Sequence, residues 1–460
     1  MNINRITRLK EGQPNHQKKY VLYWMQQSQR VFYNHALEHA ISLANEFNLP
    51  LLIYFGLTSH YPDANLRHYH FMLEGLLEVK TELAKKEIGF VFKLQSPEEG
   101  IQAFLKDAQA LIMDTGYLRH QLIWRQRVYA NASQQYPDLF IDIVDTDLIV
   151  PVAVASQKAE YGAYTLRPKL MRLYQEFMDF KSLLKVNITW QLTMKSDDDL
   201  SDLTSLEKKL NLDESVLPSK QYHGGYKEAK QHLYDFLKDD ANEYPLSNDP
   251  GFDRTSKLSM YLHFGQISAL EILDEMNLAM INRTLSQEAY EAFFEQLLVR
   301  RELAFNYVAY HRGYDKFETM TEPWAYQSLR EHNQDYRTYL YTVKEMESYQ
   351  THDPYFNAAM KEMVISGYMH NYMRMYWAKK IIEWTQSHKQ AYETILYLNN
   401  RYFLDGRDPN SYAGVAWCFG KHDRAWTERP IFGKLRYMND KGLERKFDMD
   451  SFIKRINDLK

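Results

Sequence analysis

Short apolar runs alternate with longer amphipathic stretches through the first 190 residues. The apolar runs have strand length and the stretches between them have helical spacing; the runs lie at 20–25, 49–57, 89–94, 110–114 and 139–145, and the helical stretches at 30–48, 66–86, 97–107 and 119–135. Strands that alternate with helices in this way indicate a parallel sheet covered by helices. We therefore expect residues 1–190 to form an α/β, Rossmann-like domain.

The residues that follow the first predicted strand limit the ligands that this sheet could hold. Sheets of this type often bind nucleotide-like molecules at the carboxyl ends of their strands. A dinucleotide site requires a glycine-rich turn there, whereas residues 23–30 read YWMQQSQR. A standard NAD site is therefore not expected. A nucleotide-binding enzyme with a helical substrate domain stays open as an alternative.

The pattern changes after residue 190. Residues 191–224 are acidic, mix Ser, Thr and Leu without a period, and end in a glycine pair, as an interdomain connector does. Helical periodicity then dominates to the end of the chain, with helix-length segments at 225–239, 266–280, 287–311, 332–347, 355–387 and 389–399. We expect residues 225–460 to form an all-α domain.

Length and composition narrow the class of protein. A chain of 460 residues is too long for one hydrophobic core, and 45% hydrophobic with 25% charged residues is typical of soluble globular proteins. No stretch reaches the ~18 uncharged apolar residues of a spanning helix, and the polar start lacks the apolar core of a secretion signal. We expect a monomer in the cytoplasm, with no membrane contact.

Cysteine content and charge bear on metals and partners. The single cysteine, Cys418, excludes an internal disulfide and makes a cysteine-built zinc site implausible, so no metal is expected. The net charge is −4, yet residues 421–460 carry 11 Lys and Arg against 7 Asp and Glu. A basic C-terminal surface suits a nucleic-acid partner, and it is equally typical of a solvated charged segment.

Two segments of the helical half place polar side chains beside apolar ones. DRTSKLSMYLHFGQIS (253–268) offers hydroxyls before an apolar helix, which suits a phosphate, although such residues more often only cap the helix. GYMHNYMRMYWAKKIIEW (367–384) places several polar residues and two tryptophans on the faces of one helix. The tryptophan spacing is also what core packing produces.

A third segment, 399–439, mixes aromatic and cationic residues with Gly, Asn and Asp. A loop of this length is hard to explain as a solvated connector. Aromatic rings beside arginines are what a protein needs in order to stack unpaired bases while it holds phosphates.

These segments resemble the photolyase–cryptochrome family, and two stretches resemble its class II cyclobutane pyrimidine dimer photolyases. GKHDRAWTERPIFGKLRYMN (420–439) is similar to the C-terminal signature of that class. FFEQLLVRRELAFNY (293–307) is similar to the other signature, with Gln296 in place of a usual Glu and Tyr307 in place of Phe. TSKLSMYLHFGQIS and MHNYMRM are similar to segments of the wider family.

The resemblance implies light-dependent repair of pyrimidine dimers in DNA, by an electron from photoexcited, reduced FAD held in the helical domain. The residues that match flavin contacts of the family are Thr255, Ser256, Leu258, Ser259, Leu262, Asn371, Arg374, Asn399 and Asp405. Arg374 and Asp405 match an ion pair beside the isoalloxazine. Asn399 matches the residue that faces the flavin N5, with Asn400 as the alternative. These three, with Glu302, are the expected catalytic residues.

The resemblance also implies a site for a flipped-out dimer. The matching lesion and DNA contacts are Glu302, Asn371, Met375, Trp417, Arg424 and Arg429. A protonated or hydrogen-bonded Glu302 would stabilise charge on the dimer. Trp377 and Trp384 are the expected electron-transfer residues, whereas Phe356 stands where the family has Trp, which leaves the photoreduction route open.

Two further points stay open at the level of the sequence. The N-terminal domain is expected to hold an antenna chromophore such as a deazaflavin, of undetermined identity. A cryptochrome-like blue-light receptor is the alternative function, because it would share the fold and the flavin.

Overall fold

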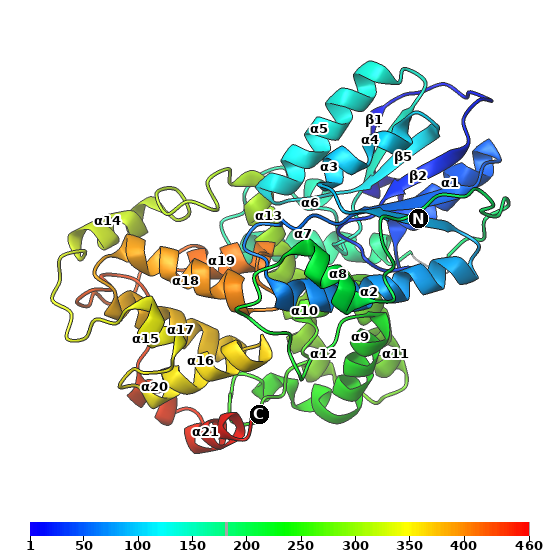
Figure 1. The fold of residues 1–460 in the computed structure, drawn as a ribbon. Helices are drawn as coiled ribbons and strands as arrows, with labels where there is room; N and C mark the ends of the chain where they lie inside the picture. The colour runs from blue at the N-terminus through cyan, green and yellow to red at the C-terminus, as the bar shows by residue number, and fades with distance from the viewer. Residues whose placement is uncertain (180–182, 460) are drawn as a thin grey trace.

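The computed structural model describes residues 1–179 and 183–459 and contains a six-stranded sheet followed by a helical body (Figure 1). The sheet has the order β1-β6-β5-β2-β3-β4, and its strands are β1 (Ile6–Lys10), β2 (Tyr20–Trp24), β3 (Leu51–Gly56), β4 (Gly89–Lys93), β5 (Ala108–Asp114) and β6 (Phe140–Val144). Strands β2 to β6 pair in parallel, whereas β1 pairs antiparallel with β6. The parallel sheet expected for the N-terminal half is confirmed, with β1 as an unpredicted edge strand.

Helices cover both faces of this sheet. They are α1 (His35–Phe47), α2 (Leu66–Lys85), α3 (Pro97–Gly100), α4 (Gln102–Leu105) and α5 (Arg119–Gln135). Two further helices, α6 (Val152–Ala155) and α7 (Ala163–Leu173), follow β6 and pack on the helical body instead. Apolar residues of α1 and the end of α2 pack on one face, and those of α4 and α5 pack on the other. Every residue of β2, β3 and β5 is buried, which explains why these strands read as continuous apolar runs. The half-exposed ITRLK of β1 carries no such signal.

The segment 191–224 is not the featureless connector that its sequence indicates. It contains α8 (Leu203–Leu210), which begins after the N-cap Asp202 and buries Leu206 and Leu210. These leucines join apolar residues of α2 and β4 in one cluster. The segment is therefore packed on the α/β half, and the boundaries of the two domains stay a prediction.

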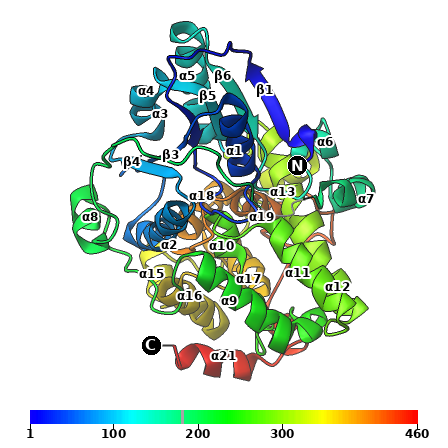
Figure 2. The ribbon, with the colours of Figure 1, turned by 90° about the vertical axis from the view of Figure 1, so that its right-hand side faces the viewer.

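The second half of the chain is helical, as expected (Figure 2). Its helices are α9 (Tyr226–Asp235), α10 (Ser259–His263), α11 (Ala269–Ile281), α12 (Gln287–Phe294), α13 (Arg301–Tyr310), α14 (Pro323–Glu331), α15 (Val343–Glu347), α16 (Pro354–Ser366), α17 (Asn371–Trp384), α18 (His388–Tyr402), α19 (Pro409–Cys418), α20 (Asp440–Glu444) and α21 (Met449–Asn457). A π-helical turn, η5 (Glu295–Arg300), joins α12 to α13.

Three expectations for this half are wrong in detail. Of the helix expected at 332–347, only the last residues form one, α15, because residues 332–342 are irregular and α14 ends before them at Glu331. The helix expected at 355–387 is broken into α16 and α17, because Gly367 adopts a left-handed φ of 79° that ends α16. The loop expected at 399–439 contains the end of α18 and the whole of α19, which Asp408 and Pro409 begin.

The helical body has two apolar clusters, and α13 contributes to both of them. The two halves of the chain meet through buried polar contacts as well. Arg67 of α2 donates to the carbonyls of Met363 and Tyr402, at 3.2 and 3.1 Å. Arg30, in the loop after β2, donates to the carbonyl of Gly265 at 3.0 Å. Within the described residues, no helix is long and apolar enough to span a bilayer.

Candidate functional site

An ion pair at the start of α17 connects two of the segments singled out in the sequence. Arg374 donates to both carboxylate oxygens of Asp405, at 2.9 and 3.0 Å, and its Nε donates to the carbonyl of Met369. Its guanidinium lies 4.0 Å from the ring centroid of Phe403. Both partners of the pair are partly exposed, so they keep some contact with solvent. A bidentate pair of this kind holds a positive group in a fixed direction.

The first turn of α17 exposes one face although the helix lies inside the helical body. Asn371 is exposed, and Arg374 and Met375 are partly exposed, whereas Met373 and Tyr376 behind them are buried. The exposed three follow the i, i+3, i+4 spacing that the sequence indicated. This face is therefore available to a ligand.

A second exposed face lies on α19, which packs beside α17 and α18 (Figure 1). Asn410 and Gly414 are exposed and Trp417 is partly exposed, at the i, i+4, i+7 spacing of one helical face. A Cβ added to Gly414 would meet nothing within 4 Å. Asn410 and Gly414 were missed because residues 399–439 were interpreted as a loop; their spacing inside PNSYAGVAW was the available signal.

Two cations flank the ring of Trp417. The guanidinium of Arg436 lies 5.1 Å from the Trp417 ring and 4.3 Å from that of Trp426, and the ammonium of Lys379 lies 5.9 Å from Trp417. Asp423 accepts two hydrogen bonds from Arg436, at 3.1 and 3.3 Å. Trp417 is thus held in place by its neighbours while part of its ring stays accessible.

The hydroxyl segment ahead of α10 forms an irregular loop. Thr255 Oγ1 hydrogen bonds to the Tyr368 hydroxyl at 2.8 Å, and Lys257 donates to Thr255 at 2.6 Å. Ser256 is partly exposed and Ser259 is exposed, whereas Leu258 is buried and Leu262 is partly buried. The two serine hydroxyls are therefore available to a ligand, and the threonine is tied to Tyr368, which precedes α17.

The contacts of Asn399 and Asn400 distinguish between these neighbours. Asn400 donates to Asp63 at 2.9 Å, and its side-chain oxygen accepts from the amides of Asn399 and Arg407, at 3.0 and 3.1 Å. Asn400 is therefore fully engaged. The side-chain oxygen of Asn399 has no hydrogen-bond partner within the described residues, which favours Asn399 over Asn400, and its expected contact with the flavin stays a prediction.

Glu302 does not join the faces of α17 and α19. Its side chain is buried, and its Oε1 accepts from the backbone amides of Ile149 and Val150, at 2.7 and 3.2 Å. Its Oε2 has no partner among the described groups. Burial raises the pKa of Glu302 to about 8. These contacts tie α13 to the segment after β6, and the expected contact with a dimer stays a prediction.

Replacing Glu302 with Gln should remove a pH dependence of stability. The folded protein binds this proton more tightly than the unfolded chain, whose carboxyl has a pKa of 4.5, so ionisation costs stability as the pH rises from about 4.5 to about 8. The free energy of unfolding of the wild type should fall relative to Glu302→Gln by up to about 1.4 kcal/mol per pH unit in this window. Urea unfolding at pH 5, 7 and 8.5 measures the difference in the free energy of unfolding between the wild type and Glu302→Gln. If that difference does not change with pH, the raised pKa of Glu302 is contradicted.

The two tryptophans of α17 are buried and connect to different aromatic neighbours. Trp384 lies 5.0 Å from Phe356 and 5.3 Å from Tyr341, between ring centroids. Trp377 lies 6.2 Å from Phe403, the ring that also contacts Arg374. Phe356 therefore occupies the ring position next to Trp384 at which a tryptophan was expected.

Arg424 and Arg429 lie on the surface beyond α19. Both are exposed, and neither forms an ion pair with a carboxylate in the part of the chain that the structure describes. Arg424 lies over the ring of Trp426 at 4.8 Å, and Arg429 over that of Tyr437 at 5.0 Å. Both guanidinium groups are therefore open to solvent, and their expected contact with DNA stays a prediction.

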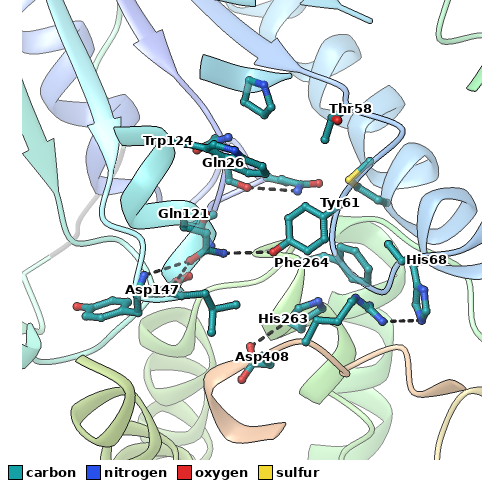
Figure 3. Close-up of a pocket in the computed structure, with 18 of the residues that line it drawn as sticks. Gln26, Thr58, Tyr61, His68, Gln121, Trp124, Asp147, His263, Phe264 and Asp408 are labelled. Carbon is teal, nitrogen blue, oxygen red and sulfur yellow. Dashed lines mark hydrogen bonds and ion pairs between the residues drawn. The ribbon is translucent and has the colours of Figure 1, made fainter. Parts of the chain in front are cut away.

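A pocket lies at the carboxyl ends of β2, β3 and β5, and Leu262, an expected flavin contact, is among its lining residues (Figure 3). Its lining includes Tyr61, Gln121 and Trp124 from the α/β half, and His263 and Asp408 from the helical half. Gln121 donates to the Tyr61 hydroxyl at 3.3 Å, and His263 pairs with Asp408 at 3.1 Å. The side-chain oxygen of Gln26 and one guanidinium nitrogen of Arg407 line this pocket without a hydrogen-bond partner among the described residues.

The loop after β2 shows why no nucleotide phosphate is expected there. Asp114, at the end of β5, accepts hydrogen bonds from the backbone amides of Gln26, Gln27 and Ser28, at 2.9, 2.8 and 3.2 Å. A carboxylate thus already takes the amide donors that a glycine-rich turn would offer to a phosphate. The alternative of a nucleotide-binding enzyme loses its main support.

Comparison with known proteins gives consistent matches. The family model described as DNA photolyase matches residues 21–186. A deoxyribodipyrimidine photo-lyase of Methanothermobacter thermautotrophicus is 43% identical, over 100% of this chain and 99% of its own length. One from Arabidopsis thaliana is 38% identical, over 95% of this chain and 89% of its own length. The solved structure of a Synechocystis cryptochrome has a TM-score of 0.76 at 13% identity, and the match covers 96% of this chain and 89% of that one.

Proposed function

From its membership of the deoxyribodipyrimidine photo-lyases, the DNA photolyase family, we propose that this chain repairs cyclobutane pyrimidine dimers in DNA with light and FAD. The similarity of the two signature segments places it in class II. The observation that carries the proposal is the pair of exposed faces on two helices that pack against each other: α17 exposes Asn371, Arg374 and Met375, and α19 exposes part of Trp417.

The residues around this region suit FAD. Ser259 offers an exposed hydroxyl for phosphates, Ser256 offers a partly exposed one that accepts only from the Leu258 amide at 3.4 Å, and Asn399 offers a carboxamide oxygen without a partner among the described residues. Gly414 leaves room at the surface of α19 for a flat molecule to approach the backbone. The Arg374 and Asp405 pair would set a positive potential beside the isoalloxazine, which favours its reduced, anionic form. Bound and reduced, FAD would supply the light-driven electron transfer by which the two bonds between the pyrimidines are broken.

The protein's part in repair is extrusion, positioning and exclusion of water. Enzymes that act on a base must take it out of the duplex, and a dimer costs less to extrude because it stacks and pairs poorly. The accessible part of the Trp417 ring would stack on the extruded dimer, and Met375 would pack against it with its adaptable thioether. Arg424 and Arg429 would hold phosphates at the rim.

The pocket in Figure 3 suits an antenna chromophore. Tyr61 and Trp124 offer ring contacts to a flat aromatic molecule, and Gln26 and Arg407 offer unpaired polar atoms to its edge. The pocket also adjoins the expected flavin site, because Leu262, one of the residues that match flavin contacts, is among its lining residues. A deazaflavin fits this chemistry, and so does any flat chromophore with hydrogen-bonding groups on its rim.

The visible spectrum of the purified protein tests the cofactor assignment. We expect about one FAD to be released per chain on denaturation. Protein that is colourless and cannot be reconstituted with FAD contradicts the proposal.

Any additional chromophore should appear as a second absorbance in the same spectrum. The double variant Gln26→Leu, Arg407→Met should lose that absorbance while it keeps FAD.

A repair assay separates repair from light sensing. Dimer-containing DNA is incubated with the reduced protein in the dark and under blue light, and the remaining dimers are counted. Light-dependent loss of dimers supports the photolyase assignment. Retained FAD without any such loss would favour the cryptochrome-like alternative, whose fold this chain shares.

A further inference from the structure

Both signature-like segments of the chain contact one segment of the N-terminal half, residues 156–164, which comprises the connection between α6 and α7 and the first two residues of α7; we call it the tyrosine loop. Asn306 of α13 donates to the carbonyl of Lys158 at 3.0 Å and accepts from the amide of Glu160 at 2.8 Å. His422, from the C-terminal segment, contacts the carbonyl of Tyr161 at 2.8 Å. Burial lowers the pKa of His422 to about 4, so the neutral ring donates this hydrogen bond from Nδ1.

Further contacts fix the same loop from inside. The Tyr310 hydroxyl of α13 donates to the carbonyl of Ser156 at 2.8 Å. The only carboxylate of the loop, Glu160, points inward, is 3% exposed, and is neutralised by Lys169. Four backbone groups of one short loop are thus held by side chains from elsewhere in the fold. The loop is rigid before any partner arrives, which lowers the entropy cost of binding.

The outer side of the loop is aromatic and cationic. Tyr161 and Tyr164 are 47% and 64% exposed, with ring centroids 6.1 Å apart. Lys158 is exposed and forms no ion pair within the described part of the chain. Two exposed phenols and a free ammonium, with the acidic group turned inward, match the hydrogen-bond donors that bind DNA phosphates.

The position of the loop links it to the proposed DNA surface. His422 is two residues from Arg424, so the loop continues the surface that carries the exposed arginines beyond α19. Helices α6 and α7, which flank the loop, lie beside α13 and on the opposite side of the molecule from α8 (Figure 2). The α/β half is thereby brought next to the segment that carries Arg424.

We propose that the tyrosine loop binds the sugar-phosphate backbone of duplex DNA beside the dimer, through Lys158 and the hydroxyls of Tyr161 and Tyr164. This inference rests on the proposed function and adds a second DNA contact, supplied by the N-terminal half. Because backbone contacts carry no information about the base, they contribute equally to damaged and undamaged DNA.

The proposal is tested by measuring how tightly the flavin-bound protein binds two labelled duplexes, one with and one without a thymine dimer. The fluorescence anisotropy of the labelled DNA gives the affinity at several salt concentrations. Lys158→Ala should weaken binding severalfold on both duplexes and reduce the slope of log affinity against log salt by about 1. The double variant Tyr161→Phe, Tyr164→Phe should weaken both duplexes without changing that slope. The matched controls are Lys208→Ala on α8 and Tyr336→Phe, exposed residues outside the loop.

The outcomes separate this inference from the function on which it rests. Loop variants that bind both duplexes like the controls, or that lose only the dimer-containing duplex, overturn the inference. A wild type that neither prefers dimer-containing DNA nor repairs it overturns the proposed function instead. The loop variants could also lose self-association while they bind DNA as the wild type does. That result would show that the loop contacts a second copy of the chain, and it would overturn the inference.

Discussion

Replacing Trp417 with alanine is expected to weaken binding to dimer-containing DNA by about five- to more than a hundredfold, because a stacked base contributes ~1–3 kcal/mol. The ring lies on the exposed face of α19, in line with Asn410 and Gly414, and is only partly covered. Binding to undamaged DNA and flavin content should hardly change. Affinity for both duplexes, the flavin spectrum and the melting temperature are measured together, with Trp417→Phe as the control that keeps a ring.

A core role for Trp417 makes the opposite prediction. Part of the ring packs against the apolar cluster of the helical body. If that packing were its only role, the alanine variant would lose ~3–5 kcal/mol of stability and release flavin, with all DNA binding lost together. Equal weakening on both duplexes would likewise remove Trp417 from the lesion site.

Replacing Trp377 with phenylalanine should slow photoreduction of the oxidised flavin strongly, while chemically reduced enzyme still repairs. A phenylalanine ring is far harder to oxidise than an indole, and Trp377 is the tryptophan whose neighbour Phe403 contacts Arg374. The rate of flavin reduction under blue light with an external reductant is the measurement. Unchanged photoreduction would make Trp377 a packing residue only.

Phe356→Trp is the matched gain-of-function variant. Phe356 is fully buried against Trp384, at the ring position where the family resemblance places a tryptophan. If electrons reach the flavin through Trp384, the added indole should speed photoreduction. The larger ring costs ~1–3 kcal/mol in a packed core, so the melting temperature is followed in parallel. A stable variant with unchanged photoreduction would exclude this route.

The strands and the family could be read from the sequence because both depend on local order along the chain. Strands β2, β3 and β5 are buried on both faces, so their apolar runs are unbroken and easily recognised. The exposed edge strand β1 pairs with β6 more than 130 residues away and carries no such run. The short helices α8 and α19 were missed because Ser, Asp and Gly in their surroundings equally favour loops.

The site was predictable only in part, because sequence patterns report contacts between residues that are near one another along the chain. The ion pair of Arg374 and Asp405 and the shared face of Asn371, Arg374 and Met375 followed from motif resemblance and helical spacing, and the structure contains both. That Glu302 binds the backbone at 149–150 could not be read from spacing, since its partners are more than 150 residues away.

Tertiary structure alone distinguished Asn399 from Asn400 and brought Asn306 and His422 onto one loop of the other half of the chain. In each case the outcome depends on which hydrogen-bond partners folding places nearby, across separations of 146 to 337 residues. The sequence by itself determined which residues could form strands, helices and motifs, because those patterns are set by neighbours along the chain. The tertiary structure decided which polar groups stay free for a ligand, because distant segments pack together and give the remaining polar groups their hydrogen-bond partners.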